Sequence, residues 1–232
     1  LTMNGSKFVY QRQYLLKKCS KIIFNSDWSK NKFVKGLNLD AIYRNKICTI
    51  NQSTKKNLVN LQKKEKIISF VGKLNKNKGY DLFGEAIIKV LNKHNDWKAY
   101  VAGDEARDKL IYNHPKLKIL GFQSHKKIIN LLKKTSISVV CSRWEEPFGR
   151  VSLEASANGC AVIISNRGGL PETNKHAVIL EKLDAQTLFK KINFLIKNKY
   201  KRISIQKKSY NDFYLTNKYV SNLIDNVRLE NL

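Results

Sequence analysis

The sequence predicts an α/β fold built on a doubly wound parallel sheet. Two observations predict it. From residue 66 onward, short apolar runs rich in β-branched residues alternate with longer stretches whose apolar residues recur at helical spacing. Most apolar runs are followed by glycines and polar residues that can turn the chain. Strands that alternate with helices of this length are typical of a parallel sheet with helices on both faces.

The elements of this sheet follow from composition and spacing. Apolar runs predict strands at residues 67–72, 98–103, 117–121, 137–141, 160–165 and 177–180. Periodic stretches predict helices at residues 80–93, 125–134, 150–158, 184–198, 201–213 and 217–229. Ser124 can cap the second of these helices, and Gly159 is a normal stop after the third. Residues 104–112 fit a helix or a loop equally well.

The first 65 residues have a different pattern. Residues 6–18 place apolar side chains at helical spacing, and residues 21–24 form a short apolar run typical of a strand. Residues 25–27 (NSD) can turn the chain and cap a helix over residues 28–37. Residues 38–66 lack sustained periodicity and are rich in Asn, Lys and Thr.

Composition limits the partners. The 232 residues carry a formal net charge of +26, and such a field attracts phosphates, nucleic acids or anionic membranes. AT-rich coding would explain the same excess, because Lys, Asn and Ile are all abundant. The four cysteines show no Cys-x-x-Cys spacing, which disfavours a zinc site or disulfides and favours a reducing, cytoplasmic setting.

The sequence shows no targeting or membrane segment. No apolar run approaches the ~20 residues that span a bilayer. No apolar region of a signal peptide follows the first residues. Because the sequence opens inside a helical pattern, we expect it to be a fragment.

Three loops are candidates for chemistry, because the carboxyl ends of parallel strands meet at one edge of the sheet, where ligands bind. The first is residues 71–79 (VGKLNKNKG). Its glycines allow tight turns and its lysines supply charge for a phosphate. The glycine spacing and Lys-Ser/Thr ending of a Walker loop are absent. Taken alone, this stretch favours an ordinary polar loop with surface lysines over a phosphate site.

The second loop carries Glu146, and the helix that follows it carries Glu154. Pro147 disfavours helix at the residue before it, so both carboxylates lie beside the positive end of a helix that starts near Gly149. They could form an acid/base pair as in a glycoside hydrolase, bind a divalent metal, or accept hydrogen bonds from sugar hydroxyls. The N–H of Gly149 suits a phosphate. The alternative is that Glu146 only stabilises the helix N-terminus and that Glu154 is solvated. Small residues at 155–157 count against it, because they predict a helix packed closely on the sheet, with little room for a carboxylate without a role.

The third loop is residues 166–172 (NRGGLPE), whose paired glycines allow close approach of the backbone to a ligand. An ordinary turn is the alternative. The four histidines, His94, His114, His125 and His176, show no partner spacing, and we interpret them as surface or loop residues.

Together these loops resemble the C-terminal, nucleotide-sugar-binding domain of retaining glycosyltransferases with the GT-B fold, of the family 4 group. The resemblance rests on Gly72-Lys73-Leu74 followed by Lys78-Gly79, on Glu146 and Glu154 with seven residues between them, and on Gly168-Gly169 before Glu172. It covers about residues 66–200 well, and the order and spacing of the motifs together are highly specific.

The resemblance also implies a domain organisation. It implies a Rossmann-like, nucleotide-sugar-binding domain at residues 66–213 and a linker at 51–65. Residues 1–50 look like the closing part of the family's N-terminal domain, and the helix in residues 214–232 looks like the one that crosses back to it. Most of that N-terminal domain, which shapes the acceptor site and contributes catalytic groups, is not in this sequence.

Roles for the motif residues come from the resemblance. Lys73 and Lys78 would neutralise the donor diphosphate, and Glu154 would hold the ribose hydroxyls. Glu146, the catalytic residue of the motif, would contact the donor sugar. The family usually has Arg where Lys73 stands, and lysine keeps the charge but loses bidentate phosphate geometry.

The remaining assignments concern backbone and apolar contacts. Phe148 and Gly149 would lie against the sugar and the phosphate, and the backbone around Gly121 and Phe122 would frame the base. The resemblance also places three other residues at the donor, namely Gly72, Arg150 and Val151.

The implied activity is transfer of a hexose from a UDP- or GDP-linked sugar to a glycan or lipid-linked acceptor of the cell envelope, such as lipopolysaccharide, with retention of configuration. Lysines and a helix N-terminus would stabilise the leaving diphosphate without a metal or cofactor. Same-face attack would make Glu146 a positioning group and not a nucleophile.

Two alternatives belong to other classes. A non-catalytic basic module on an anionic membrane or nucleic acid would explain the charge, but it needs neither glutamate. A two-carboxylate hydrolase would leave the diphosphate loop unexplained. We expect a cytoplasmic protein with peripheral association with the anionic inner face of a membrane, and no specific nucleic-acid partner.

Overall fold

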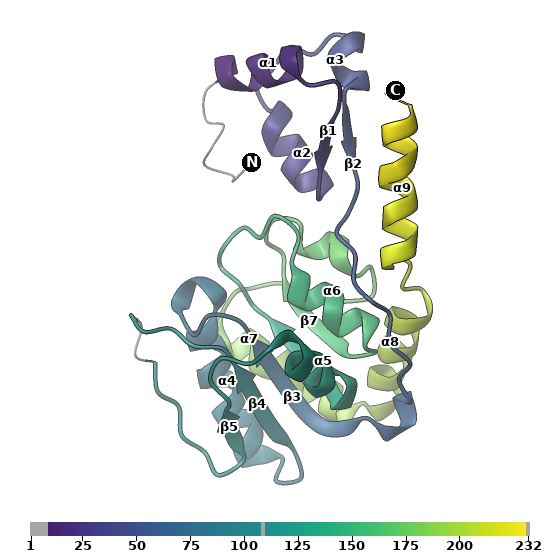
Figure 1. Cartoon of the computed structure of the whole chain (residues 1–232). Helices are drawn as coiled ribbons and strands as arrows, with labels where there is room; N and C mark the ends of the chain where they lie inside the picture. Colours follow the sequence, from purple (N-terminus) through teal and green to yellow (C-terminus); the bar gives the residue numbers. More distant parts are fainter. Residues whose placement is uncertain (1–8, 108–109, 231–232) are drawn as a thin grey trace.

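The computed structural model describes residues 9–107 and 110–230; residues 1–8, 108–109 and 231–232 lie outside the described part. The chain forms two parts (Figure 1). Residues 9–50 build a small part with helices around two strands, and most of the described residues after 50 build a larger sheet flanked by helices.

The larger part confirms the predicted doubly wound parallel sheet. Its six strands lie in the order β5-β4-β3-β6-β7-β8, and all neighbours pair in parallel. Their bounds are β3 (Glu65–Val71), β4 (Lys98–Ala102), β5 (Leu117–Ile119), β6 (Thr135–Val140), β7 (Ala161–Ser165) and β8 (Val178–Leu180). The chain adds strands on one side of β3 and then on the other side from β6. The carboxyl ends of β3 and β6 therefore mark the switch point where open sheets bind ligands.

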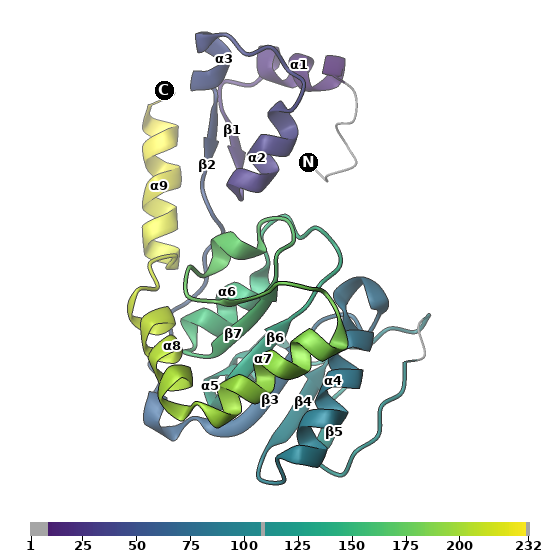
Figure 2. The same cartoon turned by 180° about the vertical axis from the view of Figure 1, so that it is seen from behind.

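Helices cover both faces of this sheet (Figures 1 and 2). One face carries α4 (Tyr80–Lys93) and α7 (Ala185–Lys197), which pack together, and the other carries α5 (His125–Lys134) and α6 (Arg150–Ala157). A further helix, α8 (Lys199–Asn211), packs against α6 and α7. Because both faces are covered, the central strands are buried, which explains why they appear in the sequence as continuous apolar runs.

The small part contains elements that the sequence predicts and elements that it misses. The predicted N-terminal helix is described as α1 (Val9–Lys18); residues 6–8 lie outside the described part. The predicted strand is β1 (Ile22–Phe24), and α2 (Asp27–Val34) begins behind Ser26, whose side chain accepts a hydrogen bond from the N–H of Ser29.

Two further elements lie in the stretch without periodicity. Strand β2 (Ile47–Thr49) pairs in parallel with β1, and α3 (Ala41–Asn45) precedes it. Each is too short to show a period: three residues cannot establish alternation, and five make little more than one helical turn. Asp40 caps α3 by accepting a hydrogen bond from the N–H of Tyr43 at 3.0 Å.

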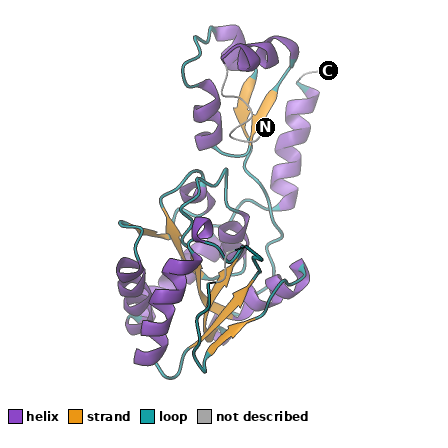
Figure 3. Cartoon of the chain, turned by 90° about the vertical axis from the view of Figure 1, so that its left-hand side faces the viewer, coloured by secondary structure: helices purple, strands orange, loops and turns teal. Residues whose placement is uncertain are grey.

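An internal segment and the last helix join the two parts (Figure 3). Residues 51–65 lead from β2 to β3 and include a short 3-10 turn, η1 (Leu61–Lys63). The last helix, α9 (Asn217–Leu229), stands beside the strands of the small part. Thr54 and Thr216 form a bridge where these two segments meet.

Lys64 holds the end of the 51–65 segment against the carboxyl ends of α5 and α6. Its ammonium donates to the carbonyl oxygens of Leu132 at 2.8 Å and Asn158 at 2.5 Å, near the carboxyl ends of α5 and α6. Burial lowers the pKa of Lys64. A cation is favourable at helix carboxyl ends, so this lysine joins two helices that flank the ligand edge.

Residues 104–112 form no helix in the positions that the structure describes. There the Glu105 carboxylate accepts hydrogen bonds from the side chains of Asn75 and Arg107, and the Arg107 guanidinium lowers the pKa of Glu105 to about 2.

Among the described residues, no helix has the length and apolar character needed to cross a bilayer.

Candidate functional site

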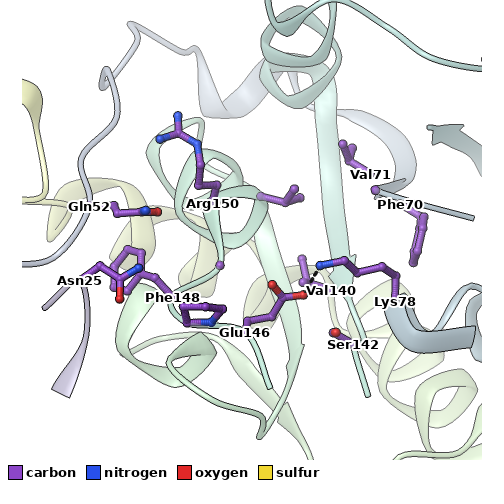
Figure 4. A pocket seen from close by; sticks show the side chains of 14 residues that line it. Asn25, Gln52, Phe70, Val71, Lys78, Val140, Ser142, Glu146, Phe148 and Arg150 are labelled. Atoms are coloured by element: carbon purple, nitrogen blue, oxygen red, sulfur yellow. Dashed lines mark hydrogen bonds and ion pairs between the residues drawn. The ribbon is translucent and has the colours of Figure 1, made fainter. Parts of the chain in front are cut away.

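A pocket of about 310 Å³ opens at the switch point (Figure 4). We call it the switch-point pocket. Its lining comes from the loop after β3, the loop after β6, the start of α6 and two places before β3. It includes Asn25, Gln52, Gly72, Lys78, Ser142, Glu146, Phe148, Gly149, Arg150 and Val151.

The loop that carries Glu146 is held by backbone contacts from the loop after β7. The carbonyl oxygen of Glu146 accepts a hydrogen bond from the N–H of Gly169 at 2.7 Å. At Gly168, φ is +59°, and a Cβ there would overlap the same carbonyl oxygen. Only glycine allows this approach without displacing the loop. The third candidate loop, with Gly168 and Gly169, therefore supports the second loop, which carries Glu146.

Lys78 and Glu146 face each other across the pocket. The Lys78 ammonium lies 2.5 Å from Glu146 Oε1, with side chains 33% and 14% exposed (Figure 4). Lys78 ends a 3-10 turn, η2 (Lys76–Lys78), that Asn75 caps by accepting from the N–H of Lys78. The pair brings the first and second candidate loops together, as the motifs predict.

The N-terminus of α6 faces this pocket without a side-chain cap. Gly149 occupies the cap position at φ +113°, a conformation that favours glycine, and Arg150 and Val151 begin the helix. All three residues line the pocket. The first N–H groups of a helix lack intrahelical partners and carry partial positive charge, so this end suits an anion.

Glu154 lies one turn further along α6 and is 4% exposed. Its Oε1 is 3.1 Å from both His125 Nε2 and Arg150 Nη2. It is not among the residues that line the switch-point pocket. The sequence predicts His125 to be a surface or loop residue; its side chain is 65% exposed, and it contacts this glutamate.

Besides Glu154, three predicted site residues lie outside the pocket lining. Lys73 is exposed beside Gly72, and Phe122 is 78% exposed. The carbonyl oxygen of Gly121 accepts from the N–H of Gly103, at the same edge of the sheet. Phe148 does line the pocket but is only 1% exposed.

The ring of Phe148 packs in a hydrophobic cluster. Its neighbours there include Ile50 from the end of the small part, Leu153 from α6 and Val220 from α9. The pocket thus rests on side chains from both parts of the chain. Asn25 and Gln52 belong to no motif in the sequence. They line the pocket for the same reason: they follow β1 and β2 and are brought to the pocket by docking.

Glu172 makes a charged contact between the two parts. Its carboxylate accepts hydrogen bonds from the N–H groups of Asp27 at 2.7 Å and Trp28 at 2.8 Å, the first two residues of α2. A negative charge at a helix N-terminus is stabilising. Close by, buried Ser26 donates to the carbonyl oxygen of Pro147 at 2.5 Å. The loops of the pocket therefore bind the start of α2 directly.

Among the described residues, neither a reactive thiol at Cys141 nor a cluster of metal ligands is found. Burial raises the pKa of Cys141 to about 12, and its thiol donates to the carbonyl oxygen of Gly79 at 3.2 Å. A thiol with that pKa is no nucleophile at neutral pH. In the described part of the chain, no three His, Cys, Asp or Glu side chains gather as metal ligands.

Residues 51–212 match the family model described as glycosyl transferases group 1, which is more than half of the chain. The chain belongs to this family. A glycosyltransferase of Methanocaldococcus jannaschii, described as uncharacterized, is 36% identical over 126 residues, covering 52% of this chain and 32% of that protein. Spore coat protein SA of Bacillus subtilis is 31% identical over 162 residues, covering 62% and 43%. This group 1 chain therefore spans less than half the length of either relative.

Solved structures of glycosyltransferases share its fold. Anabaena HepE in complex with UDP-glucose matches with a TM-score of 0.78 at 19% identity, over 96% of this chain and 67% of that chain. The C-terminal domain of the group 1 family protein LpcC from Francisella tularensis matches with a TM-score of 0.55 at 29% identity, over 62% and 82%. The prediction of the Rossmann-like, C-terminal half of a GT-B glycosyltransferase is confirmed.

The contact of Glu172 with α2 leads to a first prediction. Replacing Glu172 with Ala leaves two N–H groups of α2 without their acceptor, which should lower the free energy of unfolding by about 1–2 kcal/mol. Amide hydrogen exchange in residues 22–34 should become faster, as measured by mass spectrometry. Glu85→Ala, an exposed glutamate on α4, is the matched control. Unchanged exchange in that segment would show that Glu172 does not hold the small part in place.

Proposed function

We propose that this group 1 chain is the donor-binding part of a retaining glycosyltransferase of the family 4 group. The donor is a nucleoside-diphosphate sugar, UDP- or GDP-linked, and the acceptor is a cell-envelope glycan or lipid. One observation carries the proposal: the uncapped N-terminus of α6 at Gly149 faces a pocket that also holds the Lys78–Glu146 pair. Helix N–H groups and an ammonium suit a diphosphate, and a carboxylate suits sugar hydroxyls.

The proposed binding mode places the diphosphate between Lys78 and the first turn of α6. Gly72 and Val151 lie on the pocket wall beside it. Lys73 carries no ion pair in the described part of the chain, and its exposed side chain can turn towards the phosphates. The donor sugar then lies at Glu146, above the packed ring of Phe148.

The nucleoside end of the donor extends from α6 towards β5. Glu154 accepts hydrogen bonds from the ribose hydroxyls, and Arg150 and His125 hold its carboxylate in place. The backbone at Gly121 and the ring of exposed Phe122 frame the base, at the same sheet edge. Each of these contacts is a proposal for this chain.

The proposed reaction uses charge more than proton transfer. When the bond from the sugar to the diphosphate breaks, negative charge grows on the leaving phosphate oxygen. The Lys78 ammonium and the α6 N–H groups are already oriented there, so they stabilise that charge with no metal or cofactor required. The acceptor hydroxyl attacks the anomeric carbon on the same face and passes its proton to the leaving phosphate oxygen. Glu146 orients the sugar without forming a bond to it.

Relatives support the substrate classes. HepE was solved with UDP-glucose, and a relative from Rhizobium meliloti, 28% identical over 127 residues, is named a lipopolysaccharide core mannosyltransferase. We propose cytoplasmic location with peripheral association with an anionic membrane face. A purely electrostatic module for membranes or nucleic acid is the second candidate, favoured by the net charge of +26. It gives no role to the nearly buried Glu154.

Calorimetric titration with UDP, GDP, ADP and their sugars tests donor binding. At least one nucleotide should bind. Glu154→Ala and Lys78→Ala should each weaken that binding about tenfold to a hundredfold, because each removes a charged hydrogen-bond partner. Lys89→Ala, an exposed lysine on α4, should leave it unchanged. Absence of binding by all of these nucleotides would eliminate the donor site.

The role of Glu146 has its own test. Glu146→Gln keeps the side chain's size and removes its charge, so in the full-length protein we expect turnover of a nucleotide sugar to fall at least about 100-fold. Nucleoside diphosphate affinity should change less than about threefold. Glu145→Gln, its half-buried neighbour, is the control. Near-normal turnover in the Glu146 variant would remove this residue from catalysis.

A further inference from the structure

A second pocket lies beside the proposed donor site. It has a volume of about 390 Å³ and is bounded by α5, the segment after β2 and the starts of α6 and α9. We call it the α5 pocket. Its lining is Ser53, Thr54, Lys55, Asn57, His125, Lys126, Ile129, Asn130, Lys133, Arg150 and Asn217. Arg150 also lines the switch-point pocket, so the two pockets are neighbours.

The α5 pocket is rich in basic side chains, and no carboxylate is among its lining residues. Lys55, Lys126 and Lys133 line it together with His125 and Arg150, which both contact Glu154 Oε1 at 3.1 Å. In the described part of the chain, the ammonium groups of its three lysines have no Asp or Glu oxygen within 4.0 Å, whereas the adjacent Lys134 pairs with Glu65 at 3.6 Å. Charges of one sign gathered in a concave surface repel each other and raise the potential for an anion.

The geometry of α5 aligns these groups. His125, Ile129 and Lys133 follow at intervals of four residues, so they form one stripe along the helix, with Lys126 and Asn130 beside it. The stripe is about 12 Å long at 1.5 Å per residue. The pocket therefore accepts a group longer than a single phosphate ion.

The start of α5 adds hydrogen-bond donors at the same place. Ser124 occupies the cap position, but its side chain accepts no N–H of the helix. The first residues of this ten-residue helix, His125 and Lys126, both line the pocket. Their N–H groups have no intrahelical acceptor, and the helix dipole makes this end positive. Asn130 and Asn217 line the pocket and bring neutral side-chain donors.

We propose that the α5 pocket binds the phosphate group of a second ligand, distinct from the donor diphosphate. The ligand class is a phosphomonoester, with the phosphate at the start of α5 and the attached group along the Ile129–Lys133 stripe. One wall of the pocket is the segment that leads to the small part, and another contains Asn217 at the start of α9. A bound phosphate would therefore contact both the sheet domain and the two segments that connect it to residues 9–50.

Inorganic phosphate is the probe for this site. In ¹H–¹⁵N spectra at constant ionic strength, phosphate should shift the amide signals of His125 and Lys126. The double variant Lys126→Ala/Lys133→Ala should weaken this binding at least tenfold. The matched control is Lys207→Ala/Lys208→Ala, which removes the same charge from exposed positions on α8, and it should bind like the unmodified chain. Lys78→Ala should also leave these shifts in place, which separates this site from the donor site.

Three outcomes would overturn the proposal. One is an equal loss of binding in the α8 control, which would indicate general charge. Another is a set of shifts confined to residues near Gly149 and Lys78. The third is an absence of phosphate-dependent shifts at the start of α5. Failure of donor binding by all nucleotides, by contrast, would leave this test unaffected.

A vesicle experiment identifies the source of the phosphate once the shifts are seen. If sedimentation with phosphatidic acid vesicles falls at least tenfold in the α5 double variant relative to the α8 control, the ligand is a lipid headgroup. Equal sedimentation of both variants, with phosphate shifts retained in the control, supports a soluble phosphomonoester.

Discussion

The candidate site depends on how closely two stretches of backbone approach each other. The carbonyl oxygen of Glu146 lies against Gly168 and accepts the N–H of Gly169, and no larger side chain fits at Gly168. This contact fixes the path of the loop after β6. The path of this loop lets Glu146 reach Lys78. It also places the left-handed turn at Gly149 from which α6 starts. Backbone geometry, more than the side chains themselves, thus determines where the carboxylate, the ammonium and the helix N-terminus lie in this site.

The same loop joins the sheet to residues that come before it in the chain. Ser26 and the start of α2 bind to Pro147 and Glu172, and the ring of Phe148 packs with Ile50 and with residues of α9. Any movement of the small part is therefore coupled to the loop that carries Glu146. The chain spans less than half the length of the two relatives compared above.

The sequence predicts what depends on local pattern and misses what depends on docking. The sheet and its helices follow from β-branched runs and periodic stretches, and the loops that meet at the switch point follow from their glycines and charges. Strand β2 is too short for a period, and its place beside β1 comes from tertiary pairing. Asn25 and His125 carry no motif; their positions at the pocket and at Glu154 become visible only when distant segments are folded together. Phe148 belongs to a motif, but its burial depends on α9 and on Ile50.

We propose that the uncapped start of α6 and Lys78 together hold a diphosphate. A crystal structure of the chain with a bound nucleoside diphosphate would show whether they do. We predict phosphate oxygens within hydrogen-bond distance of the N–H groups at Gly149–Val151 and of the Lys78 ammonium, with the ribose at Glu154. A nucleotide bound elsewhere, with the start of α6 in contact with water alone, would contradict the claim.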